Sequence, residues 1–371
     1  FEYNTEKILN AITQAREQQV DLIVFSEMAV CGYPPLDFLE FTDFIEKCLI
    51  AVHKIARHCK GIAAVVGSPA FSPTLESKTL YNSAFYLVDG KIENVIHKAL
   101  LPTYDVFDEY RYFEQGKTFN VVKLHGRKIA ITVCEDLWNL ESDPLYKYCP
   151  MDELIKQQPE FIVNIAASPF SYRHNEERKK ILKQNAVKYG LPVFYVNSIG
   201  AQTDLIFDGG SMVMDKHGHA VDELSPFVET LKVYDVETDN GELKFNASAQ
   251  LQTTTVISNT ETFEFAVSET AISRIHDALL LGIKDYFSKM GFTKATLGMS
   301  GGIDSAVVLA LAAEALGREN VLPVMMPSQF SSDHSVSDSE KMIATLQMQS
   351  SKIPIEPVFE TYLNSLQPLF N

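Results

Sequence analysis

Short apolar runs of strand type recur through the first 236 residues, and stretches with helical spacing lie between them. Continuous apolar runs favour strands buried on both faces, whereas apolar residues three and four positions apart mark one face of a helix. Strands are expected at residues 21–25, 61–69, 161–165 and 193–196. Helices are expected after Asn4 and Thr5, which can cap the first, then at residues 37–59 and 175–189.

Three hairpins are predicted among these elements. The first spans residues 81–97 around Asp89-Gly90, the second spans 121–133 around His125-Gly126, and the third spans 210–221. Buried strands that alternate with helices and hairpins indicate a layered α/β domain, which we assign to residues 1–236.

The pattern changes after residue 236. Residues 237–267 are rich in Asp, Asn, Gly, Ser, Gln and Thr and read as a connection between domains. A helix with regularly spaced Ile and Leu residues then opens a second domain, assigned to residues 268–371. This domain contains apolar strand-like runs at 295–299 and 321–325, with a helix expected at 306–316.

A glycine turn joins the first of these strands to the helix, in the sequence LGMSGGIDSA. A strand, a glycine turn and a helix start aim backbone N–H groups at an anion. The glycines allow close approach, and Ser300 and Ser305 add hydroxyl donors. Asp304 would repel a phosphate, so we assign it to a Mg²⁺ that bridges phosphate oxygens. The alternative is an ordinary glycine-rich turn.

Composition narrows the class of protein. The 371 residues suffice for two domains, and the formal net charge of −16 argues against an extended nucleic-acid or anionic-membrane surface. No apolar run is long enough for a membrane span. Five cysteines form no C-x-x-C pair, which favours free thiols in the cytoplasm. Because the chain begins at Phe1 and stops shortly after a helix, we expect both ends to be incomplete.

Three reactive side chains follow strand-like runs in the first domain: Glu27, Lys98 and Cys134. A cysteine nucleophile needs a base to remove its proton and a cation to stabilise its thiolate and the later oxyanion. A carboxylate and an ammonium supply both without a histidine. Taken singly, each residue has a plainer explanation, since a cysteine after a strand commonly packs in the core and Glu and Lys are commonly solvated.

Three longer motifs favour the catalytic explanation. SEMAVCGYPP, HKALLPTYDVFDEYRYF and VCEDLW resemble the nitrilase superfamily, which implies an α-β-β-α sandwich. The resemblance implies that Glu27 is the general base, Lys98 the oxyanion-stabilising cation, Cys134 the nucleophile and Glu109 a second active-site glutamate. It further implies that substrate is bound by three residues, Tyr104, Ser168 and His174. Where the family often has a lysine, this chain reads Arg173-His174.

The glycine turn matches the S-G-G-x-D-S loop of the ATP pyrophosphatases. A nitrilase-type domain followed by such a loop resembles the glutamine-dependent NAD⁺ synthetase family, as do DLIFDGGS, MPSQFSSDHS and IPIEPVF. The resemblance implies a Rossmann-like (adenine nucleotide alpha hydrolase) parallel-sheet domain, of which this chain holds part. The resemblance further implies that ATP is bound in this domain by Ser300, Gly301, Gly302, Asp304, Ser305 and Met326, and that Asp304 binds Mg²⁺.

The implied reaction releases ammonia from glutamine and uses ATP to amidate nicotinic acid adenine dinucleotide. A homo-oligomer is also implied. Residues 204–211 either line the ammonia path or form a plain surface hairpin, and Met326 either contacts adenine or fills the core. Two other functions stay open: a nitrilase-type amidotransferase with another acceptor, and a non-catalytic nucleotide-binding scaffold.

Overall fold

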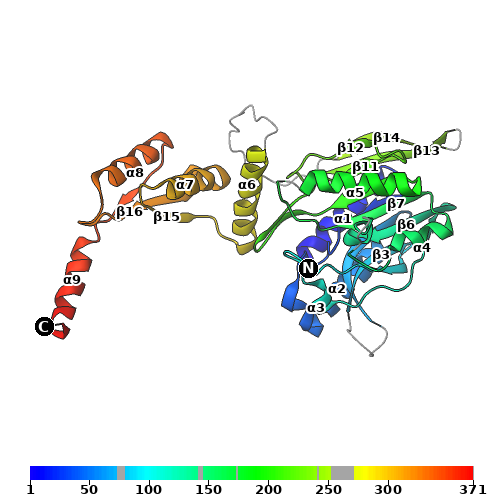
Figure 1. Cartoon of the computed structure of the whole chain (residues 1–371), viewed down its shortest axis with the longest axis horizontal. Helices are drawn as coiled ribbons and strands as arrows, with labels where there is room; N and C mark the ends of the chain where they lie inside the picture. The colour runs from blue at the N-terminus through cyan, green and yellow to red at the C-terminus, as the bar shows by residue number, and fades with distance from the viewer. Residues whose placement is uncertain (73–79, 141–144, 173, 240–241, 252–270, 371) are drawn as a thin grey trace. The chain divides into compact units, whose positions relative to one another are not determined.

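The computed structural model describes residues 1–72, 80–140, 145–172, 174–239, 242–251 and 271–370 (Figure 1). The chain divides into two compact units, Phe1–Val256 and Ile257–Asn371. Each unit has its own hydrophobic core.

Two sheets form the centre of the first unit. The first sheet has the order β1-β2-β3-β4, with β1 parallel to β2 and the other pairs antiparallel. Its strands are β1 (Leu22–Val24), β2 (Ala63–Phe71), β3 (Leu80–Val88) and β4 (Lys91–His97). The second sheet has the order β12-β11-β8-β7-β6-β5, with β6, β7 and β8 parallel. Its strands are β5 (Val122–Leu124), β6 (Arg127–Val133), β7 (Phe161–Ala166), β8 (Val193–Asn197), β11 (Met212–Met214) and β12 (Ala220–Glu223).

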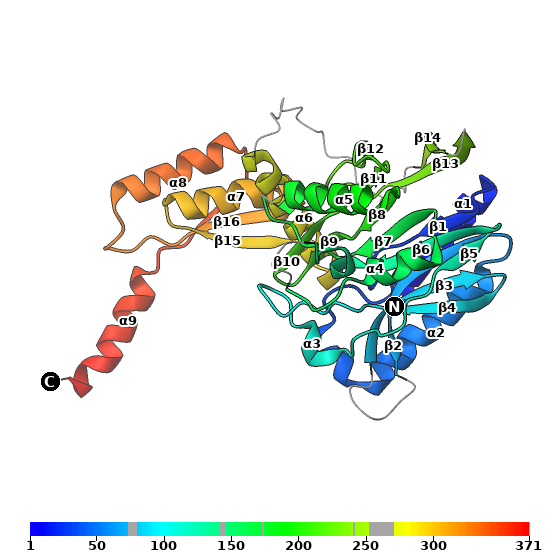
Figure 2. The same ribbon diagram turned by 45° about the vertical axis from the view of Figure 1, so that its right-hand side comes forward.

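Alternate residues of β2 show how the layers pack. Ala63 and Val65 pack against residues of the second sheet, whereas Ala64 and Val66 pack against two long helices, α1 (Glu2–Glu17) and α2 (Thr42–His58). On the far side of the second sheet lie α4 (Pro150–Leu154) and α5 (His174–Tyr189). In Figures 1 and 2, α5, β7, β6, β3 and α2 follow one another from top to bottom. This order confirms the expected α-β-β-α sandwich.

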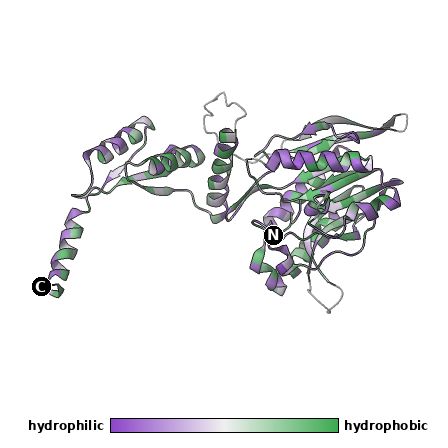
Figure 3. Ribbon diagram, in the orientation of Figure 1, coloured by the Kyte–Doolittle hydropathy of each residue, from purple (hydrophilic) through white to green (hydrophobic). Residues whose placement is uncertain are grey.

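Hydropathy follows the layers. Figure 3 shows the inner strands mostly in green, whereas α5 is mostly purple. Such a helix is held in place by its few buried residues, which include Ile181 and Leu182, and its other face is solvated. The remaining short elements are η1 (Leu36–Glu40), α3 (Glu109–Tyr112), η2 (Cys134–Leu137), η3 (Ile155–Gln157), and the paired strands β9 (Ile199–Gln202) and β10 (Leu205–Asp208).

Three local predictions differ from the structure. The first helix begins at Glu2 after Phe1, so Asn4 and Thr5 lie inside it. The helix expected at 37–59 is two elements, because extended Phe41 separates η1 from α2. Within the expected connection, β13 (Leu231–Asp239) pairs with β14 (Glu242–Leu251), so its first part is strand. Backbone pairing satisfies polar residues as well as apolar ones, which hides such strands from a hydropathy pattern. Residues 252–270 lie outside the described part of the chain.

The second unit contains a parallel sheet of order β15-β16-β17, as expected for the Rossmann-like part. Its strands are β15 (Ala295–Met299), β16 (Val321–Met325) and β17 (Ser351–Lys352). Its helices are α6 (Ala271–Met290), α7 (Ile303–Leu316), η4 (Arg318–Asn320), α8 (Asp333–Thr345), α9 (Glu356–Leu366) and η5 (Gln367–Leu369). Met299, Leu309 and Met325 join the strands and helices in one core.

Candidate active sites

A buried lysine lies between two buried carboxylates in the first unit. Nζ of Lys98 is 2.9 Å from Oε1 of Glu27 and 2.7 Å from Oε1 of Glu109. The three side chains are only 1–4% exposed. Removing these charges from water costs free energy, which the attraction between them offsets only if every partner is held in place. Buried ionised groups arranged in this way are typical of a functional site.

The backbone positions these side chains closely. Glu27 follows β1, and a Cβ atom on Gly67 of β2 would lie 2.4 Å from the amide nitrogen of Met28 and 2.7 Å from Cα of Glu27. Only glycine permits this approach. Lys98 follows β4, and its N–H donates to the carbonyl of Asn82 at 2.8 Å. The strand ends therefore bring both charges to one place.

Cys134 follows β6 and begins η2. Its φ angle of +44° lies in the left-handed region, which is strained for a residue with a side chain. Burial raises the pKa of the Cys134 thiol well above its usual value, the Glu27 carboxylate raises it further, and the Lys98 ammonium lowers it. The thiol is therefore protonated at rest, and a nearby base is needed before it can attack.

The charges of Lys98 and Glu109 depend on each other. Burial disfavours the Lys98 ammonium, but Glu109 and Glu27 outweigh this and raise the lysine's pKa. Burial also raises the pKa of Glu109 to about 7, with Lys98 opposing the shift. The lysine is thus a permanent cation that can face a thiolate or an oxyanion.

Two polar residues in this site were not predicted from the sequence. Nδ2 of Asn82 donates to Oε1 of Glu27 at 2.6 Å, and the hydroxyl of Tyr33 donates to Oε1 of Glu109 at 2.8 Å. The N–H of Ala167 completes the set around Glu27, donating to Oε2 at 2.8 Å. Asn82 lies within strand β3 and belongs to none of the motifs, so the sequence carried no signal for it.

Glu135, directly after Cys134, was also not singled out from the sequence. It is 4% exposed, and its carboxylate accepts hydrogen bonds from the hydroxyls of Tyr104 at 3.0 Å and Tyr146 at 3.1 Å. Tyr104, assigned to the substrate pocket, is thereby placed next to the cysteine segment. Glu135 is part of the VCEDLW motif, and its place next to Cys134 is the feature of the sequence from which it could have been identified.

The other predicted substrate residues follow β7, with Ser168 on the loop and His174 at the start of α5. The N–H of Ser168 donates to Oδ1 of Asn197 at 2.8 Å, and Nδ2 of Asn197 donates to the Gly209 carbonyl at 2.9 Å. His174 begins α5, where its ring meets Trp138 edge to face, and burial lowers its pKa. Arg173 lies outside the described residues.

Asp208, within residues 204–211, forms a second buried ion pair with Arg178 of α5. Nη2 of Arg178 donates to Oδ2 of Asp208 at 2.6 Å, and Nη1 donates to the Gly209 carbonyl at 3.2 Å. Their side chains are 1% and 6% exposed. The end of this segment is therefore anchored in the interior through Arg178.

In the second unit, the glycine turn follows β15 as expected. Gly301 has a φ of +79°, and a Cβ atom there would lie 2.2 Å from the carbonyl oxygen of Ser335. The hydroxyl of Ser300 lies 3.1 Å from that of Ser305 and accepts the N–H of Gly302 at 3.2 Å. The turn thus lies against the first turn of α8, so two helix N-termini meet at one place.

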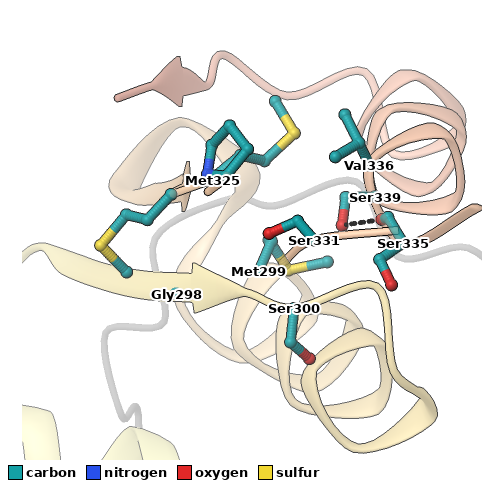
Figure 4. Close-up of a pocket in the computed structure, with 10 residues that line it drawn as sticks. Gly298, Met299, Ser300, Met325, Ser331, Ser335, Val336 and Ser339 are labelled. Carbon is teal, nitrogen blue, oxygen red and sulfur yellow. Dashed lines mark hydrogen bonds between the residues drawn. The ribbon is translucent and has the colours of Figure 1, made fainter. Parts of the chain in front are cut away.

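A cavity of about 330 Å³ opens there (Figure 4). Of the residues assigned to the nucleotide, Ser300 and Met326 line it. Figure 4 also shows serines of the segment 331–339 around the cavity, with Ser339 donating to the Ser335 carbonyl. The full lining is Gly298, Met299, Ser300, Met325, Met326, Pro327, Ser331, Ser335, Val336 and Ser339.

Asp304 is exposed in the first turn of α7, close in sequence to these donors. Within the described residues, no cluster of three or more His, Cys, Asp or Glu side chains could hold a metal. Mg²⁺ commonly binds through one or two carboxylates together with substrate phosphates. A single carboxylate at the turn fits that mode.

Known protein families match both units. The carbon-nitrogen hydrolase family matches residues 1–243, and the NAD synthase family matches residues 275–370. Both resemblances seen in the sequence are therefore confirmed. No helix in the described ranges has the length and apolar character that a membrane crossing requires.

Curated relatives include glutamine-dependent NAD⁺ synthetases. The one from Synechocystis sp. is 39% identical over 99% of this chain, and the one from Thermotoga maritima is 32% identical over all of it. The chain spans 64% and 65% of the lengths of these two relatives.

Solved structures agree with the sequence matches. A glutamine-dependent NAD⁺ synthetase from Acinetobacter baumannii in complex with ADP has a TM-score of 0.84 and 30% identity, covering this whole chain and 65% of that one. An amidase from Nesterenkonia sp. AN1 has a TM-score of 0.50 and 22% identity, covering 61% of this chain and 82% of its own. The amidase supports the fold of the first unit.

Proposed function

The chain belongs to the carbon-nitrogen hydrolase family, and from this premise we propose that its first unit releases ammonia from glutamine. The second unit uses that ammonia and ATP to amidate nicotinic acid adenine dinucleotide, which makes the protein a glutamine-dependent NAD⁺ synthetase. One observation carries the first half: the Lys98 ammonium lies between Glu27 and Glu109, in the field of the Cys134 thiol. The similarity to enzymes of that name supports the second half.

In the proposed glutaminase reaction, Glu27 takes the proton from Sγ of Cys134 as the sulfur attacks the side-chain carbonyl of glutamine. The Lys98 ammonium faces the oxyanion. Glu27 then gives the proton to the departing NH₂ group, which leaves as ammonia, and a thioester remains on Cys134. Water attacks the thioester, losing a proton to Glu27. Glutamate leaves, and the proton returns to the cysteine.

The substrate-side residues complete this proposal. Glu109 holds Lys98 in place, and Tyr104, Ser168 and His174 bind glutamine. We add Glu135, since a buried carboxylate beside the nucleophile complements the ammonium group of the free amino acid. Replacing free glutamine by a substrate without that ammonium would forfeit this contact.

In the second unit, the proposed reaction begins when the carboxylate of the dinucleotide attacks the α-phosphate of ATP and pyrophosphate leaves. Ammonia then displaces AMP to form the amide. Ser300, Gly301, Gly302 and Ser305 hold the phosphates, Met326 contacts adenine, and Asp304 holds Mg²⁺. The metal, when bound, neutralises phosphate charge.

Ammonia must pass from the first reaction to the second. In neutral water ammonia is mostly protonated and is then no nucleophile, so an enclosed path is required. We assign part of the wall of this path to residues 204–211.

We further propose that the protein is a homo-oligomer in the cytoplasm. The net charge of −16 supports the proposal that it binds no nucleic acid, and the five free thiols support the location.

Two nitrogen sources test the proposal on the full-length protein. With labelled glutamine, ATP and nicotinic acid adenine dinucleotide, the label should appear in the amide of NAD⁺. Cys134→Ala should lower glutamine-dependent synthesis at least ~10³-fold and leave synthesis from ammonia within about twofold. Amidation of another carboxylate in place of this dinucleotide would refute the acceptor, and equal loss from both sources in a folded variant would refute the division of labour.

A further inference from the structure

The carboxylate of Asp136 joins two chain segments that meet at the glutaminase site. Asp136 is 2% exposed and lies in η2. Its Oδ1 accepts the N–H of Ala99 at 2.9 Å and of Leu100 at 3.0 Å. Its Oδ2 accepts the N–H of Val133 at 3.0 Å. One side chain therefore ties the segment that follows β4 of the first sheet to the last residue of β6 in the second.

These contacts lie directly beside the reacting groups. The two donors on Oδ1 are the residues that follow Lys98, and the donor on Oδ2 is the residue that precedes Cys134. Cys134 has a strained backbone, which persists only where its surroundings hold it. A carboxylate within the same short turn supplies such a restraint.

We propose that Asp136 is a positioning residue that sets the placement of the Lys98 ammonium relative to the Cys134 sulfur. The inference rests on the proposed glutaminase function and adds to it a residue that does not touch substrate. Its chemistry is specific to a carboxylate, because both oxygens accept from N–H donors. An asparagine has one accepting oxygen, and its NH₂ group would face a donor.

The charge state of Asp136 agrees with this role. Burial raises its pKa to about 6, while the N–H groups of Val133, Leu100 and Ala99 oppose the shift, as does the Lys98 ammonium. The three hydrogen bonds therefore keep a deeply buried group ionised at neutral pH.

The test compares Asp136→Asn and Asp136→Glu in the full-length protein. In Asp136→Asn we expect kcat for glutamine hydrolysis to fall ~10²-fold, with KM within about twofold. One accepting oxygen is lost, so the backbone that it held moves and the Lys98 ammonium shifts away from the Cys134 sulfur. Alkylation of Cys134 by iodoacetamide should slow about tenfold, with Cys134→Ala as the blank. Asp136→Glu, which keeps both oxygens, should recover at least a tenth of the wild-type kcat.

Two controls separate positioning from folding. Asp152→Asn removes an aspartate that accepts hydrogen bonds from Lys188 and Tyr189 on the surface, and it should leave every rate unchanged. Synthesis from ammonia should stay within about twofold in all variants. A lower melting temperature with unchanged kcat and alkylation would overturn the proposal, as would failure of both Asp136 variants to fold. If the wild-type protein does not hydrolyse glutamine but Asp136→Asn still slows the alkylation of Cys134, the proposed function is refuted and the positioning role stands.

Discussion

At the residue scale, the side chain next to Lys98 in sequence carries no charge that would compete with the lysine. His97 precedes Lys98, its Nδ1 lies 2.8 Å from the Ser83 hydroxyl, and its ring stacks on Tyr81 at 4.0 Å. Burial lowers its pKa to about 4. The imidazole is therefore neutral at physiological pH and adds no second cation beside the lysine.

This shift predicts a pH-dependent stability. Because the unfolded His97 binds a proton more readily than the folded one, its contribution is complete above about pH 6.5 and is lost as the pH falls toward 4. The contribution is about 3 kcal/mol at most. Urea unfolding from pH 7 to 4 should therefore show a smaller loss of unfolding free energy in His97→Gln than in wild type. If the unfolding free energy depended on pH in the same way in both proteins, the pKa of His97 would not be lowered by folding.

At the residue scale, a candidate catalytic set could be named because its members stand in recognisable sequence contexts. Glu27, Lys98 and Glu109 were named from the motifs, and the structure places them in contact. Asn82 could not be named, because its role depends on β3 pairing beside β2 and β4, and pairing is a long-range property. The catalytic roles assigned to this set and to Cys134 remain predictions, as do the substrate roles assigned to Tyr104, Ser168 and His174.

At the scale of elements, the close approach of β2 to the end of β1 fixes the position of Glu27. A Cβ atom on Gly67 would meet three backbone atoms, of Ser26, Glu27 and Met28, between 2.4 and 2.7 Å. Backbone cannot move aside as a flexible side chain would. The strands therefore require glycine at this point.

Gly67→Ala should displace Glu27 and abolish most glutaminase activity, with a stability loss of about 1–3 kcal/mol. Gly61→Ala is the matched control: its φ of +70° strains alanine, but nothing lies within 4 Å of the added carbon. The control should lose stability and retain kcat. Glutamine hydrolysis and thermal melts measured on both variants would decide, and a wild-type kcat in Gly67→Ala would contradict the role of this contact.

Elements with clear hydropathy were predictable, and those without it were not. The buried runs and hairpins of the first unit appear as strands near the predicted residues. The end of β13 and all of β14 were read as a connection because their residues are mixed in polarity. The short helix η1 was merged with α2 because the break at Phe41 involves no Pro or Gly. Both depend on packing that hydropathy does not encode.

At the scale of the whole molecule, each unit carries its own candidate chemistry, so damage to one should spare the other. Gly301→Ala places a carbon 2.2 Å from the Ser335 carbonyl at a φ of +79°. We expect NAD⁺ synthesis from glutamine and from ammonia to fall together by at least ~10²-fold, whereas glutamine hydrolysis persists. Assays of both syntheses and of glutamate release distinguish this from Cys134→Ala. Synthesis surviving from either source would remove the turn from the ATP site.

The sandwich has one further consequence for the life of the chain. Glu27 and Lys98 follow strands of the first sheet, whereas Cys134 follows a strand of the second, so neither sheet alone carries the proposed catalytic set. Under the proposed function, a chain still emerging from the ribosome, or one cut between the sheets, cannot hydrolyse glutamine. The proposed release of ammonia therefore begins only after folding has joined both halves of the domain.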